Sequence, residues 1–201
     1  MRFQLCIALL IGFTAFYSCT QSTKKSEVKP ETLFAQDADD WITGGDADWK
    51  FVDGELIGSL DSGSGFVMTK KSYKNFELTL EFNPDSTVNS GVYLRCKNVE
   101  ISATDCYEIN IWDLHPNQDN RTGAVVTRAT PLNKVETLNK WNTYKIRCED
   151  RRIQAWIDNV QTADLQDSQL SEGYIALQAA VGGEIRFRNV QVQPFQPGES
   201  K

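Results

Sequence analysis

Short runs of alternating apolar and polar residues, separated by turn residues, follow one another along most of the chain. In FELTLEF, residues 76–82, every second residue is Phe or Leu and the residues between them are Glu and Thr, as in a strand with one buried face. The same period of two recurs in SGVYLR, YEINIWD and YIALQA, and no segment has a helical period over a convincing length. We therefore predict an all-β fold.

The runs that we assign to strands are WKFV, ELIGS, GFVMT, NFELTLEF, GVYLRC, YEINIWD, GAVV, WNTYKIRCE, RIQAWI, YIALQA and EIRFRNVQVQP. Asp-Gly and Asp-Asn pairs between them mark hairpins, because Gly and Asn accept the positive φ of a tight turn. WKFVDGELIGS is the clearest case. Two antiparallel sheets packed by their apolar faces would satisfy all these runs, as a β-sandwich of roughly ten or more strands.

The first residues have the features of an export signal. Arg2 precedes the apolar run 5–16, and a small residue, Ser18, stands before Cys19, which is typical of a secretory signal. FYSC resembles the lipobox of bacterial lipoproteins, although Phe16 replaces the usual leucine. This resemblance implies cleavage before Cys19 and its lipidation. We expect an exported lipoprotein, in the outer membrane or facing the periplasm, held on the membrane by the lipid anchor only.

These features divide the chain into four parts. We predict a signal peptide in residues 1–18 and a lipidated cysteine with a flexible polar tether in 19–32. The β-sandwich domain is expected in 33–196, and 197–201 form a short tail.

Three cysteines follow the predicted signal and its lipidated residue. Cys96 and Cys106 flank the loop KNVEISATD between two expected strands, and they are the candidates for a disulfide in an oxidising compartment. Cys148 shares a strand face with Tyr144 and Ile146, which favours a buried free thiol. The chain has one histidine, and no spacing predicts a zinc site.

Composition and charge narrow the class of partner. Of the 201 residues, 40% are hydrophobic and 24% are charged, as in an ordinary globular domain with a sizeable core. The formal net charge is −6, and no basic run alternates with aromatic residues. Because an acidic surface repels phosphate backbones, we expect no nucleic-acid partner. The oligomeric state stays open.

One strand face is richer in aromatic and amide groups than contact with water requires. If the strands that carry Arg95, Glu108 and Gln178 lie in one sheet, its outward residues are Tyr93, Arg95, Glu108, Asn110, Trp112, Tyr174 and Gln178, with Glu81 as a further candidate. Aromatic rings cover the C–H side of a pyranose, and planar polar groups bind its hydroxyls. The pattern is thus typical of sugar recognition. Ordinary cross-strand pairing, with Arg95 bridging Glu108, explains the same residues equally well from the pattern alone.

A series of short motifs adds to this interpretation: DGELIG, FELTLEF, NSGVYLR, YEINIWD with TGAVV, WNTYKI, IDN, GYIALQ and FRNVQV. In their order and spacing they resemble the 3-keto-disaccharide hydrolase domain, long known as a domain of unknown function in bacterial secreted proteins. The resemblance extends over roughly residues 33 to 195. It implies a concanavalin A-like, jelly-roll β-sandwich of two antiparallel sheets, in agreement with the alternation.

The resemblance also implies a hydrolase for glycosides already oxidised at C3. The ketone makes the C2 proton acidic, because the resulting carbanion delocalises into an enolate. A base can then remove that proton and expel the C1 substituent by β-elimination, and water adds to the unsaturated sugar. This route needs a general base near C2, donors for the enolate oxygen and an acid for the leaving group. It does not need the paired carboxylates of ordinary glycosidases.

Carried over motif by motif, the family's polar positions are Asn89, Ser90, Arg95, Tyr107, Glu108, Asp113, Gln178, Arg188 and Asn189. Glu108 is our candidate for the base, or for a group that orients one. Arg95 and Asn110 would stabilise the enolate oxygen and bind hydroxyls, and Tyr93 and Trp112 would stack on the sugar. The further candidates for substrate binding are Asn89, Asp113 and Gln178.

His115 is the rival candidate for proton transfer, because imidazole titrates near neutral pH. It lies in the loop DLHPNQDNRTG after the YEINIWD strand. It can equally be an exposed loop residue that caps a turn before Pro116.

Two departures from the family pattern keep a second function open. Many members have Gln at the position of Asn110, and many have a histidine shortly after the LQ pair, where this chain reads LQAAVGG. If that histidine is the family's base, the chain has lost it. The alternative to an enzyme is then a non-catalytic, lectin-like carbohydrate-binding lipoprotein, with a cell-envelope scaffold as a third hypothesis.

No metal or other cofactor is predicted. Loop oxygens that could bind calcium are those of Asn83, Asp85, Asp113 and Asp119, although no spacing resembles a dedicated calcium loop.

Overall fold

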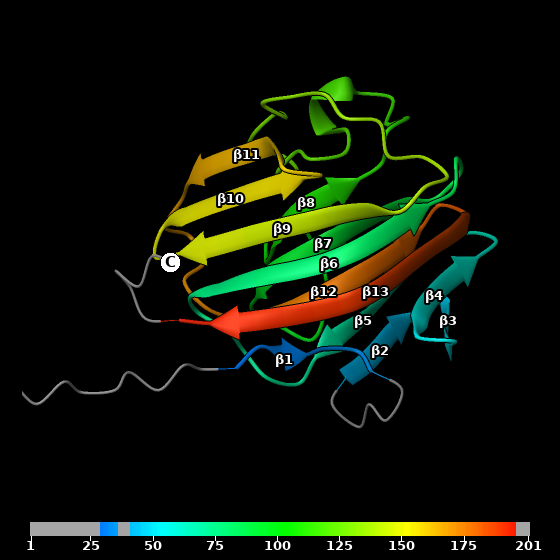
Figure 1. Ribbon diagram of the computed structural model, residues 1–201, viewed down its shortest axis with the longest axis horizontal. Helices are drawn as coiled ribbons and strands as arrows, with labels where there is room; N and C mark the ends of the chain where they lie inside the picture. Colours follow the sequence, from blue (N-terminus) through cyan, green and yellow to red (C-terminus); the bar gives the residue numbers. More distant parts are fainter. Residues whose placement is uncertain (1–28, 36–40, 196–201) are drawn as a thin grey trace, which may run out of the picture.

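Two antiparallel β-sheets pack face to face in the computed structural model, which describes residues 29–35 and 41–195 (Figure 1). The eight-stranded sheet has the order β11 (Val160–Gln166), β10 (Arg152–Ile157), β9 (Asn142–Glu149), β6 (Phe76–Pro84), β13 (Gly183–Pro194), β4 (Glu55–Leu60) and β3 (Asp48–Val52), and β1 (Glu31–Thr32) pairs with β13. The five-stranded sheet has the order β2 (Trp41–Gly45), β5 (Ser64–Thr69), β12 (Tyr174–Ala180), β7 (Asn89–Cys96) and β8 (Tyr107–Ile111). The described residues contain no helix except the short 3-10 turn η1 (Gln118–Asn120). The prediction of an all-β sandwich of two antiparallel sheets is confirmed.

The alternation of β6 shows why the eight-stranded sheet forms. Its Phe and Leu side chains are fully buried, while the Glu and Thr residues between them are partly exposed. The buried side chains join those of β7, β8 and β12 in one hydrophobic core between the sheets. No described helix is long and apolar enough to cross a membrane.

Two predicted hairpins are present. Asp53 and Gly54 connect β3 to β4 with φ angles of 51° and 85°, and Asp158 and Asn159 connect β10 to β11 with 47° and 66°. Two consecutive residues with positive φ define the turn whose twist matches that of paired strands. The predicted strand GAVV differs from expectation, because it forms isolated bridges along the outer edge of β8 rather than a named strand.

The five-stranded sheet is covered on both faces, which the sequence pattern did not predict. All five residues of β8 are buried, as are seven of the eight residues of β7. On the outward face, Ile101 from the loop 97–105 packs against a second apolar cluster that includes Met68 and Tyr93. The candidate sugar-binding face is therefore largely covered and is not an open sheet surface.

The predicted signal peptide, the candidate lipidation site Cys19 and the tail 197–201 lie outside the described residues.

Candidate functional site

The register of the five-stranded sheet brings Glu108, Tyr93 and Gln178 together. Tyr93 on β7 pairs with Glu108 on β8, and Gly91, two residues before Tyr93, pairs with Gln178 on β12. Because alternate residues of a strand share a face, these three side chains and that of Asn89 belong to the outward face.

Gly91 makes room for the carboxyl group at the centre of this cluster. A Cβ atom at position 91 would lie 3.3 Å from both Cγ and Oε1 of Glu108 and 3.4 Å from Cε2 of Tyr93. Such contacts are tighter than ordinary van der Waals packing allows. The absence of a side chain therefore lets the Glu108 carboxyl lie against the backbone of β7.

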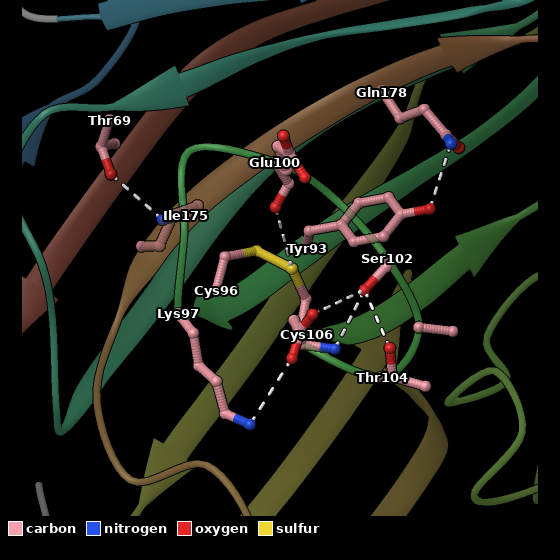
Figure 2. Close-up of a disulfide and its surroundings, with 12 residues drawn as sticks. Thr69, Tyr93, Cys96, Lys97, Glu100, Ser102, Thr104, Cys106, Ile175 and Gln178 are labelled. Carbon is pink, nitrogen blue, oxygen red and sulfur yellow. Dashed lines mark hydrogen bonds and ion pairs between the residues drawn. A yellow bond between two sulfur atoms is a disulfide. The ribbon is translucent and has the colours of Figure 1, made fainter.

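A chain of hydrogen bonds connects the three polar groups. Nε2 of Gln178 donates to the Tyr93 hydroxyl at 3.0 Å, and the hydroxyl hydrogen-bonds to Glu108. Nε2 of Gln178 also lies 3.4 Å from Oγ of Ser64. In Figure 2 the Tyr93 hydroxyl is directed towards Gln178. Since the hydroxyl accepts from the amide, its proton is free to point at the carboxylate.

Burial changes the acidity of this cluster. Glu108 is 8% exposed, and this burial raises the pKa of its carboxyl from 4.5 to about 7, although the Tyr93 hydrogen bond acts in the opposite direction. Burial, followed by the neighbouring Glu108 charge, raises the pKa of Tyr93, so its hydroxyl stays protonated. Near neutral pH, Glu108 thus exists in both the charged and the neutral form, as a group that accepts and donates protons in catalysis must.

The disulfide loop forms an apolar wall beside the polar cluster. Cys96 and Cys106 are joined as predicted, and Figure 2 shows the bond next to Tyr93. The loop is fixed at its base by the hydrogen bond from Lys97 N to Asp105 O. The residues of the second apolar cluster are Phe66, Met68, Tyr93, Cys96, Cys106 and Ala176, with Ile42, Ile101 and Tyr174 packed against it.

Trp112 and His115 lie together after the end of β8, and both are half-buried. Their ring centroids are 4.5 Å apart with the ring planes at 70°. Nδ1 of His115 accepts a hydrogen bond from the backbone N–H of Asn117 at 3.0 Å. In the neutral ring the proton is therefore on Nε2, which makes that nitrogen a donor and not a base.

Arg95 corrects one of our predictions, because its side chain does not lie on the outward face. The backbone of Arg95 has a φ of 52°, at an irregularity in the pairing of β7 with β12. The guanidinium is fully buried and donates to the carbonyl oxygens of Lys74, Asp150 and Leu170. Its donors are committed to backbone, so Arg95 stabilises the fold rather than an enolate oxygen.

Asn110 and Asp113 are also committed to the fold, contrary to prediction. The Asn110 amide donates to the carbonyl of Asn120, and its oxygen accepts from the N–H of Ile111 at 3.0 Å. Both Asp113 oxygens accept hydrogen bonds from Thr137, from the backbone N–H at 2.6 Å and the hydroxyl at 2.9 Å. These two side chains anchor the long connection between β8 and β9 instead of facing a ligand.

Glu81, the further candidate for this face, belongs to β6 in the other sheet, where it pairs with Arg188.

Sequence reasoning missed Phe66, Met68 and Ile101 as walls of the site. The available signal was GFVMT, since a run that is apolar on both of its faces indicates a strand covered on both sides. In the described part of the chain, no group of three or more His, Cys, Asp and Glu side chains could hold a metal ion.

Comparisons with known proteins agree with this architecture. A candidate glycosyl hydrolase from Parabacteroides distasonis ATCC 8503 superposes with a TM-score of 0.72 at 23% identity, over 83% of this chain and 100% of that one. The carbohydrate binding module CBM66 from Bacillus subtilis gives 0.60 at 20% identity, over 76% and 94%. A Bacillus subtilis protein of unknown function with a galectin-like fold gives 0.55 at 13% identity, over 83% and 97%. At these identities the likenesses show the fold alone, and the concanavalin A-like jelly roll is confirmed.

No curated protein matches the sequence. Residues 29–193 match the model of the family described as the 3-keto-alpha-glucoside-1,2-lyase-like domain.

Proposed function

The chain belongs to the family of 3-keto-alpha-glucoside-1,2-lyase-like domains, and from this we propose that it cleaves 3-keto-glycosides by elimination and hydration. The observation that carries the proposal is Glu108, a buried carboxyl with a pKa of about 7, hydrogen-bonded to Tyr93 on the outward face of the five-stranded sheet. Elimination requires a base of moderate strength that is substantially ionised at the working pH.

In the proposed reaction, Glu108 removes the C2 proton of the sugar. The electron pair forms the enolate with the C3 carbonyl. When the carbonyl forms again, the C1–C2 double bond is made and the bond to the C1 substituent breaks, and the leaving oxygen takes up the proton that Glu108 removed and departs as an alcohol. Water then adds across the unsaturated sugar. Tyr93 donates to one carboxylate oxygen of Glu108, which leaves the other oxygen for the proton.

This assignment accounts for the missing histidine after the LQ pair. The residues that follow Gln178 are Ala179, Ala180, Val181 and two glycines, none of which transfers protons. A base on β8 makes that histidine unnecessary. His115 is less suited to act as the base, because its Nδ1 already accepts a hydrogen bond from the backbone N–H of Asn117 and its Nε2 carries the proton. We propose instead that Nε2 donates to an oxygen of the substrate or the leaving group.

A lectin-like function is the second candidate. The likeness to a carbohydrate binding module and the half-buried Trp112 ring after the end of β8 support sugar binding without turnover. In that case Glu108 would accept a hydrogen bond from a sugar hydroxyl and no bond would break. The ligand is a carbohydrate under either proposal.

The deciding experiment offers the purified protein a 3-keto-glucoside with a chromogenic aglycone and, separately, the unoxidised glucoside. Release from the keto sugar alone, lost in Glu108→Gln, supports elimination. The matched control is Glu77→Gln on the outward side of the eight-stranded sheet, which should keep its rate. Saturable binding of sugar without any release would favour the lectin-like function.

Export and anchoring through Cys19 remain proposals. Mass spectrometry of the mature N-terminus from membranes tests them, because lipidation adds the mass of acyl chains to Cys19.

A further inference from the structure

Two amide oxygens on the outward face of the five-stranded sheet have no hydrogen-bond partner. They are Oε1 of Gln178 and Oδ1 of Asn89, and both atoms are buried. The Gln178 side chain is 7% exposed, and its nitrogen is committed to Tyr93 and Ser64. A buried oxygen without a donor carries a desolvation penalty, which a ligand that supplies a hydrogen-bond donor would relieve.

In the strand register, each of these two amide residues pairs with a residue that has little or no side chain. Gln178 pairs with Gly91, and Asn89 pairs with Ala180, so the two amides are diagonal neighbours on adjacent strands. The Glu108 carboxyl lies against Gly91. A ligand that reaches this part of the outward face would therefore meet a carboxylate and two amide oxygens, all of them acceptors, and such a site selects a ligand that presents hydroxyl protons.

We propose that Gln178 determines specificity by accepting a hydrogen bond from the C2 hydroxyl of the sugar. This inference rests on the proposed function, in which Glu108 removes the proton at C2. The hydroxyl and the proton share one carbon atom, so the group that binds the hydroxyl must lie beside the base. Gln178 meets this condition across Gly91, and Asn89 accepts from a second hydroxyl of the ring.

The test compares the 3-keto-glucoside with its 2-deoxy counterpart, which still has a C2 proton to lose. The variant is Gln178→Met, of similar length and without the acceptor. The matched control is Gln191→Met on the exposed outer side of the eight-stranded sheet. Removing the hydroxyl also changes the acidity at C2, but this effect is common to all the proteins and cancels when ratios are compared.

For each protein we compare kcat/KM for the 2-hydroxy substrate with kcat/KM for the 2-deoxy substrate. This ratio should be about tenfold larger in the wild type and in Gln191→Met than in Gln178→Met. A factor of about ten is the upper end of what one hydrogen bond between neutral groups contributes. An equal preference in all three proteins would overturn the inference and leave the elimination proposal intact, since turnover would still occur.

If no keto sugar is turned over, the elimination proposal fails, and calorimetry with methyl glucoside and its 2-deoxy counterpart still tests the contact. A preference for the 2-hydroxy sugar that is lost in Gln178→Met supports it. Binding of neither sugar, or saturable calcium binding that Gln178→Met abolishes, would overturn it.

Discussion

Replacing Glu108 by glutamine should stabilise the folded protein above neutral pH. The carboxyl has a pKa of about 7 in the folded chain, because it is buried, against an ordinary value of 4.5. As the pH rises past 4.5, the unfolded chain loses this proton while the folded chain keeps it. The free energy of unfolding of the wild type therefore falls between about pH 4.5 and pH 7 and then levels off.

The size of the effect follows from the two pKa values. Each tenfold difference in proton affinity corresponds to about 1.4 kcal/mol, so the wild type loses about 3 kcal/mol across this window. Glutamine has nearly the same shape, still accepts from Tyr93 through its oxygen and does not ionise. The advantage of Glu108→Gln should therefore be small at pH 4 and reach about 3 kcal/mol at pH 8.

Urea unfolding at one-unit steps from pH 4 to pH 8, followed by tryptophan fluorescence, measures this difference directly. Glu81→Gln is the matched control with the opposite sign. The hydrogen bond from Arg188 lowers the pKa of Glu81, so this variant should lose stability relative to the wild type as the pH rises towards 4.5. A stability difference between Glu108→Gln and the wild type that stays constant from pH 4 to pH 8 would refute our account of Glu108.

Four further predictions follow from the same contacts. The basic form of Glu108 should govern turnover, so kcat/KM for the keto sugar should rise with pH to a plateau, with a midpoint near the pKa of about 7; a flat profile would exclude it as the base. Tyr93→Phe removes the donor to the carboxylate, so the midpoint of that profile should move to higher pH. Arg95→Met should lower the free energy of unfolding in urea by at least ~3 kcal/mol, because the hydrogen bonds of a fully buried guanidinium to three carbonyl oxygens are lost; a neutral result would mean that water replaces the guanidinium. Reducing the bond between Cys96 and Cys106, ten residues apart, should cost about 2 to 3 kcal/mol in the same assay, and equal stability of the oxidised and reduced forms would contradict the entropic argument.

The layers of the fold could be predicted because alternation is a local property. In β6 each side chain follows the period of two without exception, and the Asp53-Gly54 turn has the residue types that positive φ requires. Pairing of Cys96 with Cys106 was predictable for the same reason, since both residues flank one short loop between adjacent strands.

The composition of the site was harder to predict, because it depends on contacts between distant segments. Arg95 follows the outward-facing Tyr93 at a spacing of two, yet the positive φ of its own backbone turns the side chain inward. Asn110 and Asp113 have the residue types of a binding site, but their partners come from the irregular connection between β8 and β9. Such segments have no period, so their covering of the sheet is not visible in the sequence pattern.

Cys148 limits how the remaining cysteines can react. Its side chain is fully buried in β9, and burial raises the pKa of the thiol to about 12, which leaves almost no thiolate to attack a disulfide. Cys96, Cys106 and Cys148 allow three different pairings, and the pairing of nearest cysteines closes the shortest loop, at the lowest entropic cost. Once the core has formed, scrambling of the disulfide by this thiol requires unfolding of β9. The sandwich thus protects the disulfide between Cys96 and Cys106 kinetically, because the buried Cys148 supplies almost no thiolate to attack it.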